Sequence, residues 1–284
     1  MIVTTSDINS VKTLFKNFYI PRPDSHKGQN GKILIIGGSS LFHAASLWAA
    51  EVASHFTDMV HYSSTVENEK IFHELKKTFR NGMIISKKDL EQYAFEDDVV
   101  LIGPGMMRDG REGEYTRQVV SEMIKKFPER KFVFDAGSLQ KMDKEWLLDL
   151  KTMAIVTPHQ KEFEMLFGQD VTNLPIDEKE KIVKMTAEKY HVVIILKAIV
   201  DIISDGHNLY RVEGGNAGLT KGGTGDVLAG LAASFYAKND AINSALMASI
   251  LLKTTAEALF TDQRYWYNID DIIDKLPYQL ASLI

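Results

Sequence analysis

The chain has 284 residues, of which 45% are hydrophobic and 25% charged, a composition typical of a globular protein with a large buried core. Its formal net charge is −5 and no strongly basic segment occurs, which argues against nucleic acid as a partner. The absence of cysteine excludes disulfides, thiolate metal ligands and a cysteine nucleophile. The first residues do not form a signal peptide, and no run of about 18 apolar residues occurs, so we expect a cytoplasmic protein without a membrane partner.

Short apolar runs rich in β-branched residues alternate with longer amphipathic segments. Such runs predict strands that are covered on both faces. In chain order, the predicted strands are residues 33–36, 99–102, 132–134, 154–156 and 192–196. The predicted helices are residues 113–127, 177–190, 227–237 and 241–259. This alternation predicts an α/β fold with a central, mostly parallel sheet and helices on both faces.

The segment from 202 to 210 has a different pattern. Residues 202–203 and 209–210 are apolar and flank the polar turn 204–208, which predicts a β-hairpin at the edge of the sheet. No linker, low-complexity tract or internal repeat is evident elsewhere, so we expect a single domain that spans residues 1–284.

A glycine-rich turn, Gly222-Gly223-Thr224-Gly225-Asp226, leads directly into an apolar helix. Glycine lets backbone amides converge on an anion, and the first turn of a helix adds free N–H donors and the positive end of its dipole. This pattern predicts a cradle for a phosphoryl group, with Asp226 placed to take a proton from an attacking hydroxyl. The same residues also fit a plain glycine turn with an Asp at a helix start.

Other polar and glycine residues follow the predicted strands. They are Gly37-Gly38-Ser39, Gly103-Pro104-Gly105, Asp135, His159 and Lys197. Ligands of open parallel sheets bind outside the carboxyl ends of the strands. We therefore expect these residues and the glycine turn to share one rim of the sheet.

Taken together, the chain resembles the NAD(P)H-hydrate dehydratase family of the ribokinase-like superfamily. The resemblance runs from about Arg22 to Pro277 and rests on an ordered set of short motifs. These are Arg22-Pro23-Asp24-Ser25-His26-Lys27-Gly28, Gly37-Gly38-Ser39, Gly103-Pro104-Gly105, Asp135-Ala136, Thr157-Pro158-His159, Glu162-Phe163, and Gly215-Asn216-Ala217-Gly218 through Asp226.

This resemblance implies a ribokinase-like fold and a nucleotide-dependent repair of hydrated NADH or NADPH. ATP or ADP would phosphorylate the hydroxyl on C6 of the damaged nicotinamide ring, and loss of phosphate would return NAD(P)H. Asp226 would be the catalytic residue, and the amides of Gly222, Gly223, Thr224 and Gly225 would form the anion hole.

The resemblance also implies the remaining site residues. The hydrated dinucleotide would contact Ala44, Gly105, His159, Asn216 and Asp226. The adenine nucleotide would contact Lys197, Ala198, Ile199, Val200, Asp201 and Gly225. Glu162 would help to order Mg²⁺ through water. By analogy with the family we expect a homo-oligomer, and we expect no epimerase domain of the kind that precedes this domain in many relatives.

The sequence departs from the family pattern at several positions, where His43, Met107, Lys161 and Ala198 replace glycines. These changes concern the fit of the substrate. The sequence leaves open whether the protein prefers ATP or ADP and whether it prefers the hydrate of NADH or that of NADPH. Two alternatives also remain. One is a small-molecule kinase of the same superfamily, such as a hydroxyethylthiazole-type vitamin kinase. The other is a nucleotide-binding protein without catalysis.

Overall fold

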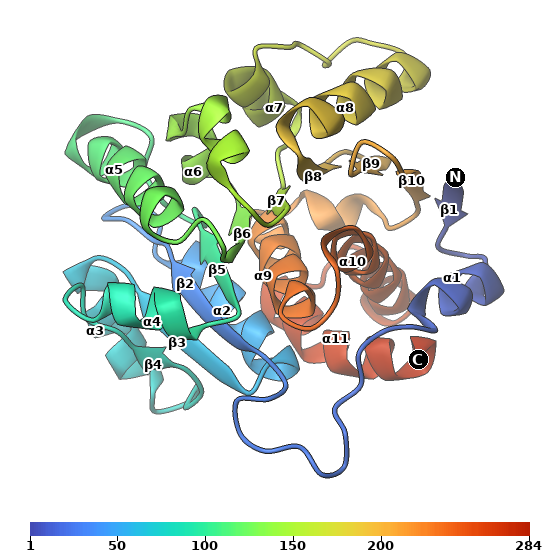
Figure 1. The fold of residues 1–284 in the computed structure, drawn as a ribbon. Coiled ribbons are helices and arrows are strands. Elements are labelled where there is room, and N and C mark those ends of the chain that lie inside the picture. Colours follow the sequence, from blue (N-terminus) through green and yellow to red (C-terminus); the bar gives the residue numbers. More distant parts are fainter.

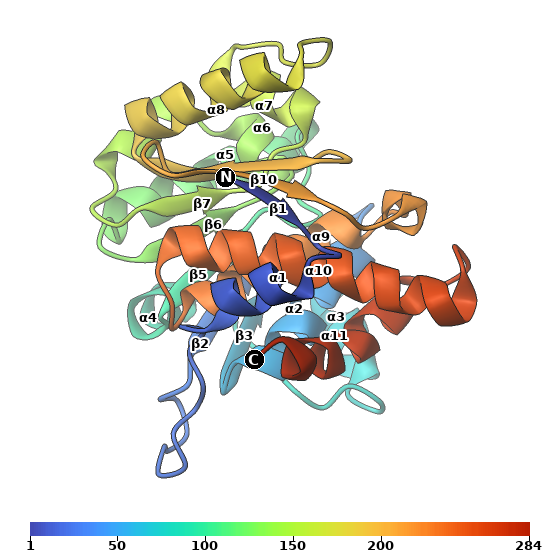
Figure 2. The same cartoon turned by 90° about the vertical axis from the view of Figure 1, so that its right-hand side faces the viewer.

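The computed structural model describes residues 1–284 and contains a ten-stranded sheet between two layers of helices (Figures 1 and 2). The strand order is β1-β10-β9-β8-β7-β6-β5-β2-β3-β4, and all pairs are parallel except those that β9 makes with β8 and β10. The predicted α/β class, with a mostly parallel sheet covered on both faces, is confirmed.

The strands are β1 (Ile2–Thr4), β2 (Lys32–Ile36), β3 (Met59–Ser63), β4 (Met83–Ile84), β5 (Val99–Ile102), β6 (Lys131–Phe134), β7 (Ala154–Val156), β8 (Val192–Leu196), β9 (Asp201–Ser204) and β10 (Leu209–Glu213). The helices are α1 (Ile8–Phe15), α2 (Ala44–Phe56), α3 (Val66–Leu75), α4 (Leu90–Glu96), α5 (Gly110–Lys126), α6 (Gly137–Lys141), α7 (Gln160–Phe167), α8 (Ile176–Tyr190), α9 (Thr224–Tyr236), α10 (Ala241–Gln263) and α11 (Ile269–Leu283). Two 3₁₀ segments, η1 (Lys144–Asp149) and η2 (Ala217–Thr220), complete the chain.

Each face of the sheet carries its own hydrophobic core, because alternate residues of every strand point to opposite faces. One core joins the sheet to α1, α2, α9, α10 and α11, and the other joins it to α4, α5, α7 and α8. Figure 2 shows these two helix layers above and below the sheet. Burial on both faces explains why the strands are nearly continuous apolar runs rather than alternating ones.

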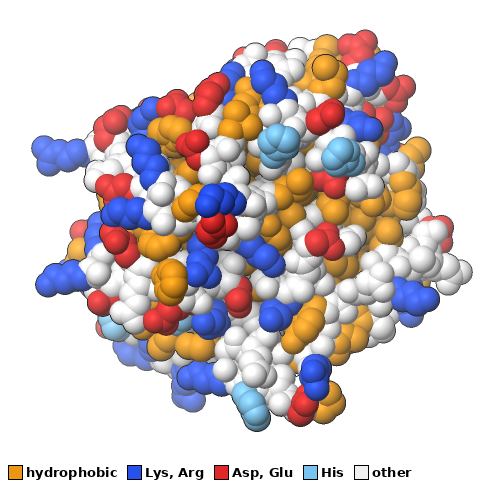
Figure 3. Space-filling view, viewed as in Figure 1, with side chains coloured by type: hydrophobic (Ala, Val, Ile, Leu, Met, Phe, Trp, Pro, Cys, Tyr) orange, Lys and Arg blue, Asp and Glu red, His pale blue; other side chains and the backbone are white.

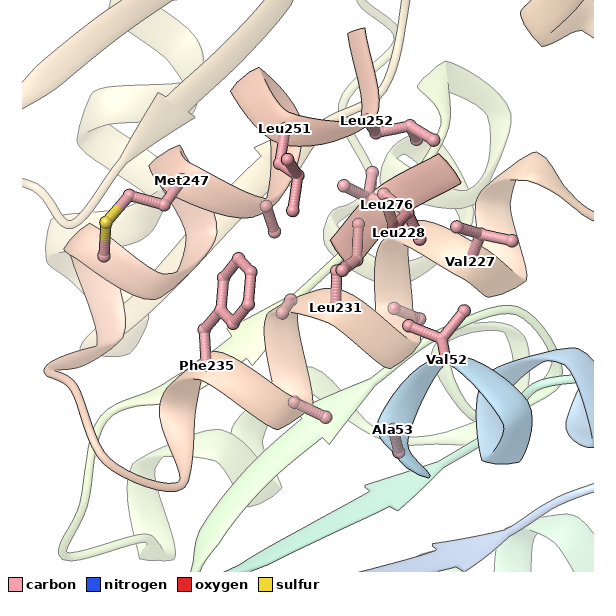
Figure 4. Close-up of a cluster of buried hydrophobic side chains, with 14 of the residues drawn as sticks. Val52, Ala53, Val227, Leu228, Leu231, Phe235, Met247, Leu251, Leu252 and Leu276 are labelled. Carbon is pink, nitrogen blue, oxygen red and sulfur yellow. The ribbon is translucent and has the colours of Figure 1, made fainter. Parts of the chain in front are cut away.

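Helix α9 lies at the centre of the larger core. All ten residues from Val227 to Tyr236 are buried, so the helix is apolar on every side. It packs between α2 and α10, and Figure 4 shows Leu231 and Phe235 among side chains of α10 and α2. This packing fixes the position of the N-terminus of α9, where the glycine turn lies.

The sheet register brings the polar residues of three neighbouring strands together. Phe134 of β6 pairs with Val156 of β7, and an isolated parallel bridge joins His159 to Lys197 just beyond β7 and β8. The residues that follow β6, β7 and β8 therefore lie at one rim of the sheet, as the sequence predicted.

The predicted hairpin is present, but its predicted place at the edge of the sheet is wrong. Strands β9 and β10 are antiparallel, and β1 pairs in parallel with β10 and covers it. Strand β1 comes from the start of the chain, far from the hairpin in sequence, so no local pattern could reveal this pairing.

The surface seen in Figure 3 mixes basic and acidic side chains with scattered apolar ones. None of the helices is both long enough and apolar enough to cross a lipid bilayer.

Candidate active site

The glycine turn before α9 has a conformation that requires glycine at one position. Gly223 is the N-cap of α9 with φ of +107°, and a Cβ there would lie 2.6 Å from the Trp48 ring and 2.8 Å from Ile269. Gly222, by contrast, faces open space. The backbone amides of Gly222, Gly223 and Gly225 donate to no acceptor within the protein. These free donors lie at the positive end of the α9 dipole, an arrangement that suits a negatively charged group.

Thr224, which the sequence placed among the anion-hole residues, is held differently. Its amide donates to the carbonyl of Lys221 at 3.3 Å, and its hydroxyl donates to the carbonyls of Leu219 and Lys221 at 2.8 and 2.9 Å. Thr224 therefore braces the turn, while its glycine neighbours offer the free amides.

Asn216 and Lys221 anchor the segment that leads into this turn. The Nζ atom of Lys221 donates to the carbonyl of Tyr265 at 2.5 Å and lies 4.8 Å from the centre of the Tyr267 ring. The Tyr267 hydroxyl donates to Oδ1 of Asn216 at 2.6 Å, and that oxygen also accepts from the amide of Gly218 at 2.9 Å. The side-chain amide nitrogen of Asn216 donates to a carbonyl of α10 at 2.8 Å. In this structure both polar side-chain atoms of the expected substrate contact Asn216 therefore have hydrogen-bond partners within the protein.

A buried ion pair lies beside the turn. The Nζ atom of Lys197 lies 2.8 Å from Oδ1 of Asp135 and 3.9 Å from Oε2 of Glu162. Asp135 is 1% exposed, and the Thr157 hydroxyl donates to its Oδ1 at 2.6 Å. A Cβ added to Gly225 would lie 3.4 Å from Lys197 Nζ. The lysine ammonium therefore reaches the first turn of α9.

Asp226 lies in the same group of charges. Burial, followed by the negative charge of Asp135, raises the pKa of Asp226 from 3.8 to about 7, with Lys197 opposing the rise and Glu162 adding to it. Burial would lower the pKa of the Lys197 ammonium, but the charges of Asp135 and Glu162 and the hydrogen bond to Asp135 raise it above its usual value. A carboxylate with a pKa near neutrality is suited to act as a general base at physiological pH.

His159 and Glu162 form a capping box at the start of α7. The amides of Lys161 and Glu162 donate to Nδ1 of His159 at 3.1 and 3.2 Å, and the amide of His159 donates to Oε2 of Glu162 at 3.0 Å. Gln140 donates to the other Glu162 oxygen at 3.0 Å. The chain holds no group of three His, Asp or Glu side chains with metal-binding geometry. The residues therefore do not form a protein cage for Mg²⁺.

A pocket of about 390 Å³ opens above Asp226. Its other lining residues come from the start of α2 and the loop before it, from the loop after β5, and from α6 and its N-cap. They are Leu41, Phe42, Ala45, Gly105, Met106, Met107, Arg108, Asp109, Ala136, Gly137 and Gln140. Of the expected substrate contacts, Gly105 and Asp226 line this pocket. Ala44 lines a neighbouring pocket with Trp48 and Glu51 instead, and its neighbour Ala45 faces the Asp226 pocket.

The expected nucleotide segment 197–201 is a firmly anchored loop. The amide of Ala198 donates to Oδ1 of Asp201 at 3.0 Å, and the Ser249 hydroxyl donates to the other oxygen of Asp201 at 2.7 Å. The buried Lys253 donates to the carbonyl of Ile199 at 2.9 Å. The side chain of Ile199 is 90% exposed, so the loop presents an apolar group to solvent at a fixed position.

Several lining residues carried no signal in the sequence. Phe42, Arg108 and Gln140 belong to no recognisable motif, and only the strand order brings their segments over Asp226. Asp135 was expected at the rim and Thr157 belongs to one of the family motifs, but their contact with each other could not be read from these separate motifs.

A glycine turn with free amides, a buried lysine and an aspartate whose pKa is raised to about 7 thus lie together at the carboxyl end of a mostly parallel α/β sheet. Solved structures share this fold, among them a ribokinase-like superfamily protein of Enterococcus faecalis that is 21% identical with a TM-score of 0.83, covering 99% of this chain and 95% of that one. The ADP/ATP-dependent NAD(P)H-hydrate dehydratase of Bacillus subtilis, co-crystallised with ATP/Mg²⁺, is 21% identical with a TM-score of 0.80, covering 98% of this chain and 97% of that one. The hydroxyethylthiazole kinase of Pyrococcus horikoshii is 16% identical with a TM-score of 0.62, over 96% of this chain and 91% of that one.

Sequence comparison then gives the family. The model of the NAD(P)H-hydrate dehydratase family matches residues 33–278, and the chain belongs to this family. The ADP-dependent (S)-NAD(P)H-hydrate dehydratase of Cenarchaeum symbiosum is 30% identical over 84% of each chain. The bifunctional NAD(P)H-hydrate repair enzyme Nnr of Methanocaldococcus jannaschii is 34% identical over 89% of this chain but only 49% of its own length. The chain thus spans about half the length of the bifunctional relatives that it matches.

Proposed function

We propose that this protein is a nucleotide-dependent dehydratase that converts hydrated NADH or NADPH back to the intact reduced cofactor. The observation that carries the proposal is the position of Asp226, whose pKa of about 7 and place beneath the pocket suit a base at the N-terminus of α9. Family membership supplies the substrate class, because relatives named for this reaction align over most of the chain.

In the first step, the hydroxyl on C6 of the hydrated ring attacks the terminal phosphoryl group of ATP or ADP. Asp226 takes the hydroxyl proton, and ADP or AMP leaves. The free amides of Gly222, Gly223 and Gly225 and the ammonium of Lys197 stabilise the negative charge on the phosphoryl oxygens.

In the second step, the lone pair of the ring nitrogen assists the departure of phosphate from C6. Loss of a proton from C5 then restores the double bond between C5 and C6, giving NAD(P)H, inorganic phosphate and ADP or AMP. Phosphorylation is needed because hydroxide is a poor leaving group and phosphate a good one.

The adenine nucleotide would lie along the loop 197–201, whose backbone is anchored by Asp201 and Lys253. We propose that Mg²⁺ arrives bound to the nucleotide phosphates, because no three His, Asp or Glu side chains of the protein are placed to hold a metal ion together.

The direct test is incubation of the purified protein with hydrated NADH and either ATP or ADP. We expect the absorbance band of the reduced nicotinamide to return, with one phosphate released for each molecule repaired. Omission of nucleotide is the control. Asp226→Asn should lower turnover by a factor of about 10² or more while nucleotide binding is retained, because it removes only the base.

The kinase alternative predicts a different product. Accumulation of a stable phosphorylated alcohol, with hydrated NADH left unchanged, would show a small-molecule kinase and contradict the dehydratase. Binding of nucleotide without turnover of either substrate would instead support the non-catalytic alternative.

A further inference from the structure

We propose that Asp135 is a positioning residue that holds the ammonium group of Lys197 against the glycine turn, so that this ammonium meets the migrating phosphoryl group. The inference rests on the proposed phosphoryl transfer and adds Asp135 and Thr157 to the residues that serve it. Asp135 reaches no reacting atom itself and acts through Lys197 and Asp226.

The first support is the arrangement of Asp135, Thr157 and Lys197 on three adjacent strand ends. Asp135 follows β6, Thr157 follows β7 and Lys197 follows β8. Oδ1 of Asp135 accepts from both the Thr157 hydroxyl at 2.6 Å and Lys197 Nζ at 2.8 Å. The carboxylate therefore has one fixed orientation, and the lysine follows it.

The second support is the backbone around Asp135. The amide and hydroxyl of Ser138 donate to the Asp135 carbonyl at 3.2 and 2.8 Å. A Cβ on Gly103 would lie 1.7 Å from that carbonyl oxygen, so only glycine permits this approach. The next residue, Ala136, has φ of 46° and ψ of −118°, a conformation that costs about 1–3 kcal/mol for a residue with a Cβ. A strained backbone of this kind persists only where surrounding contacts hold it in place. Here the strained residue is Ala136, which follows Asp135 and lines the pocket.

The third support is the position of the lysine ammonium relative to α9. Because a Cβ on Gly225 would lie 3.4 Å from Nζ, the ammonium lies beside Gly225, whose amide is one of the free donors of the turn. The charged groups that face Asp226 are Asp135, Lys197 and Glu162, and Arg108 and Asp109 lie at the rim of the pocket. Without Asp135, the lysine would keep only its contact of 3.9 Å with Glu162.

Two substitutions should move the pH dependence of catalysis in opposite directions. Asp226 must be ionised to act, so kcat/KM rises with pH through its pKa. Asp135→Asn removes a negative charge that raises this pKa and also loosens Lys197, whose smaller effect lowers it. Because the effect of Asp135 is the larger of the two, the rising limb should move to lower pH. Lys197→Met removes the positive charge that lowers it, so the limb should move to higher pH, and kcat should fall by about 10²-fold or more.

The matched control is Asp109→Asn, which removes one negative charge from the exposed rim of the same pocket without touching Lys197. The rising limb of kcat/KM for this variant should stay within about 0.3 pH unit of the wild-type position, because solvent screens a charge at the rim. Thr157→Val is a second test that keeps every charge. It should lower kcat by about tenfold through loss of the hydrogen bond that orients Asp135, with the limb unmoved.

A limb of Asp135→Asn that stays in place or moves to higher pH would overturn the inference. If Asp135→Asn does not fold, the other two variants decide. The inference would be overturned if the rising limb of Lys197→Met did not move, or if Thr157→Val kept the wild-type kcat. Carbon-13 NMR titration of the Asp226 carboxyl in nucleotide-free protein follows the same pKa without any substrate. A failure of the dehydratase proposal would therefore leave this test intact.

Discussion

Replacing Asp226 by Asn should make the folded protein more stable at neutral and alkaline pH, even as it removes activity. The pKa of Asp226 is raised from 3.8 to about 7, chiefly by burial and by the charge of Asp135. Folding therefore favours the protonated form of this acid. Ionised Asp226 therefore destabilises the folded protein. This loss of stability is absent below the unfolded-state pKa near 3.8, grows as the pH rises, and is complete above about pH 7.

The size of the effect follows from the same values. One pKa unit corresponds to about 1.4 kcal/mol, so the full rise would cost about 4 kcal/mol of folding free energy. Asp226 is partly accessible from the pocket, and solvent and salt screen its charge, so we expect about 2 kcal/mol. Asn has nearly the same shape and no charge, and should recover this amount.

Urea unfolding of wild-type protein and Asp226→Asn between pH 4 and pH 8 measures the difference. The two proteins should be nearly equal at pH 4, and the variant should be about 2 kcal/mol more stable at pH 8. Asp109→Asn serves as the control and should stay within about 0.5 kcal/mol of wild type at both pH values, since Asp109 is exposed. A gap that is equal at both pH values, or a variant less stable at pH 8, would refute the electrostatic account of the site.

Two further predictions concern the loops around the pocket. Gly223→Ala should lower the free energy of unfolding by about 2–4 kcal/mol, because Gly223 has a positive φ and a Cβ there would meet Trp48. Gly222→Ala should change the free energy of unfolding by less than about 0.5 kcal/mol, because nothing lies near a Cβ at that position. Urea denaturation of the two variants tests this pair of predictions. Arg108→Ala should raise KM for the hydrated dinucleotide about tenfold and leave KM for ADP unchanged, since Arg108 is the cation that lines the pocket and suits a pyrophosphate. Arg111, which does not line the pocket, is the matched control in the same steady-state assay, and an equal KM in both variants would exclude Arg108 from substrate binding.

The sequence predicted the central strands well because burial on both faces leaves an unmistakable apolar run. It missed β3, in which His61 is buried. That histidine is paired with Asp97 at 2.7 Å, a partner 36 positions away, and its ring lies 4.4 Å from that of Tyr93. A polar residue satisfied by a distant partner breaks the apolar pattern without preventing the strand.

The site was predictable to a similar extent. The glycine turn and Asp226 form one contiguous motif, so their joint placement at the start of α9 could be read directly. The separate roles of neighbouring residues could not be read from the sequence, because Thr224 and Asn216 have the same donor and acceptor atoms whether they bind a ligand or brace a loop. In the structure both brace the turn, and Asp135, expected only as a rim residue, holds the lysine that faces it.

The packing of Gly223 against Trp48 gives the protein a built-in optical probe. Trp48 borders the turn at Gly223, and Trp266, which is 84% exposed, follows Tyr265, whose carbonyl accepts a hydrogen bond from Lys221 just before the turn. Indole emission responds to nearby charge and to changes in solvation, so two natural fluorophores flank the place where phosphate would arrive. Trp146 packs against the core on the opposite face of the sheet, with the Arg117 guanidinium 4.8 Å from its ring, and serves as an internal reference. Ligand entry can therefore be followed in the unlabelled protein.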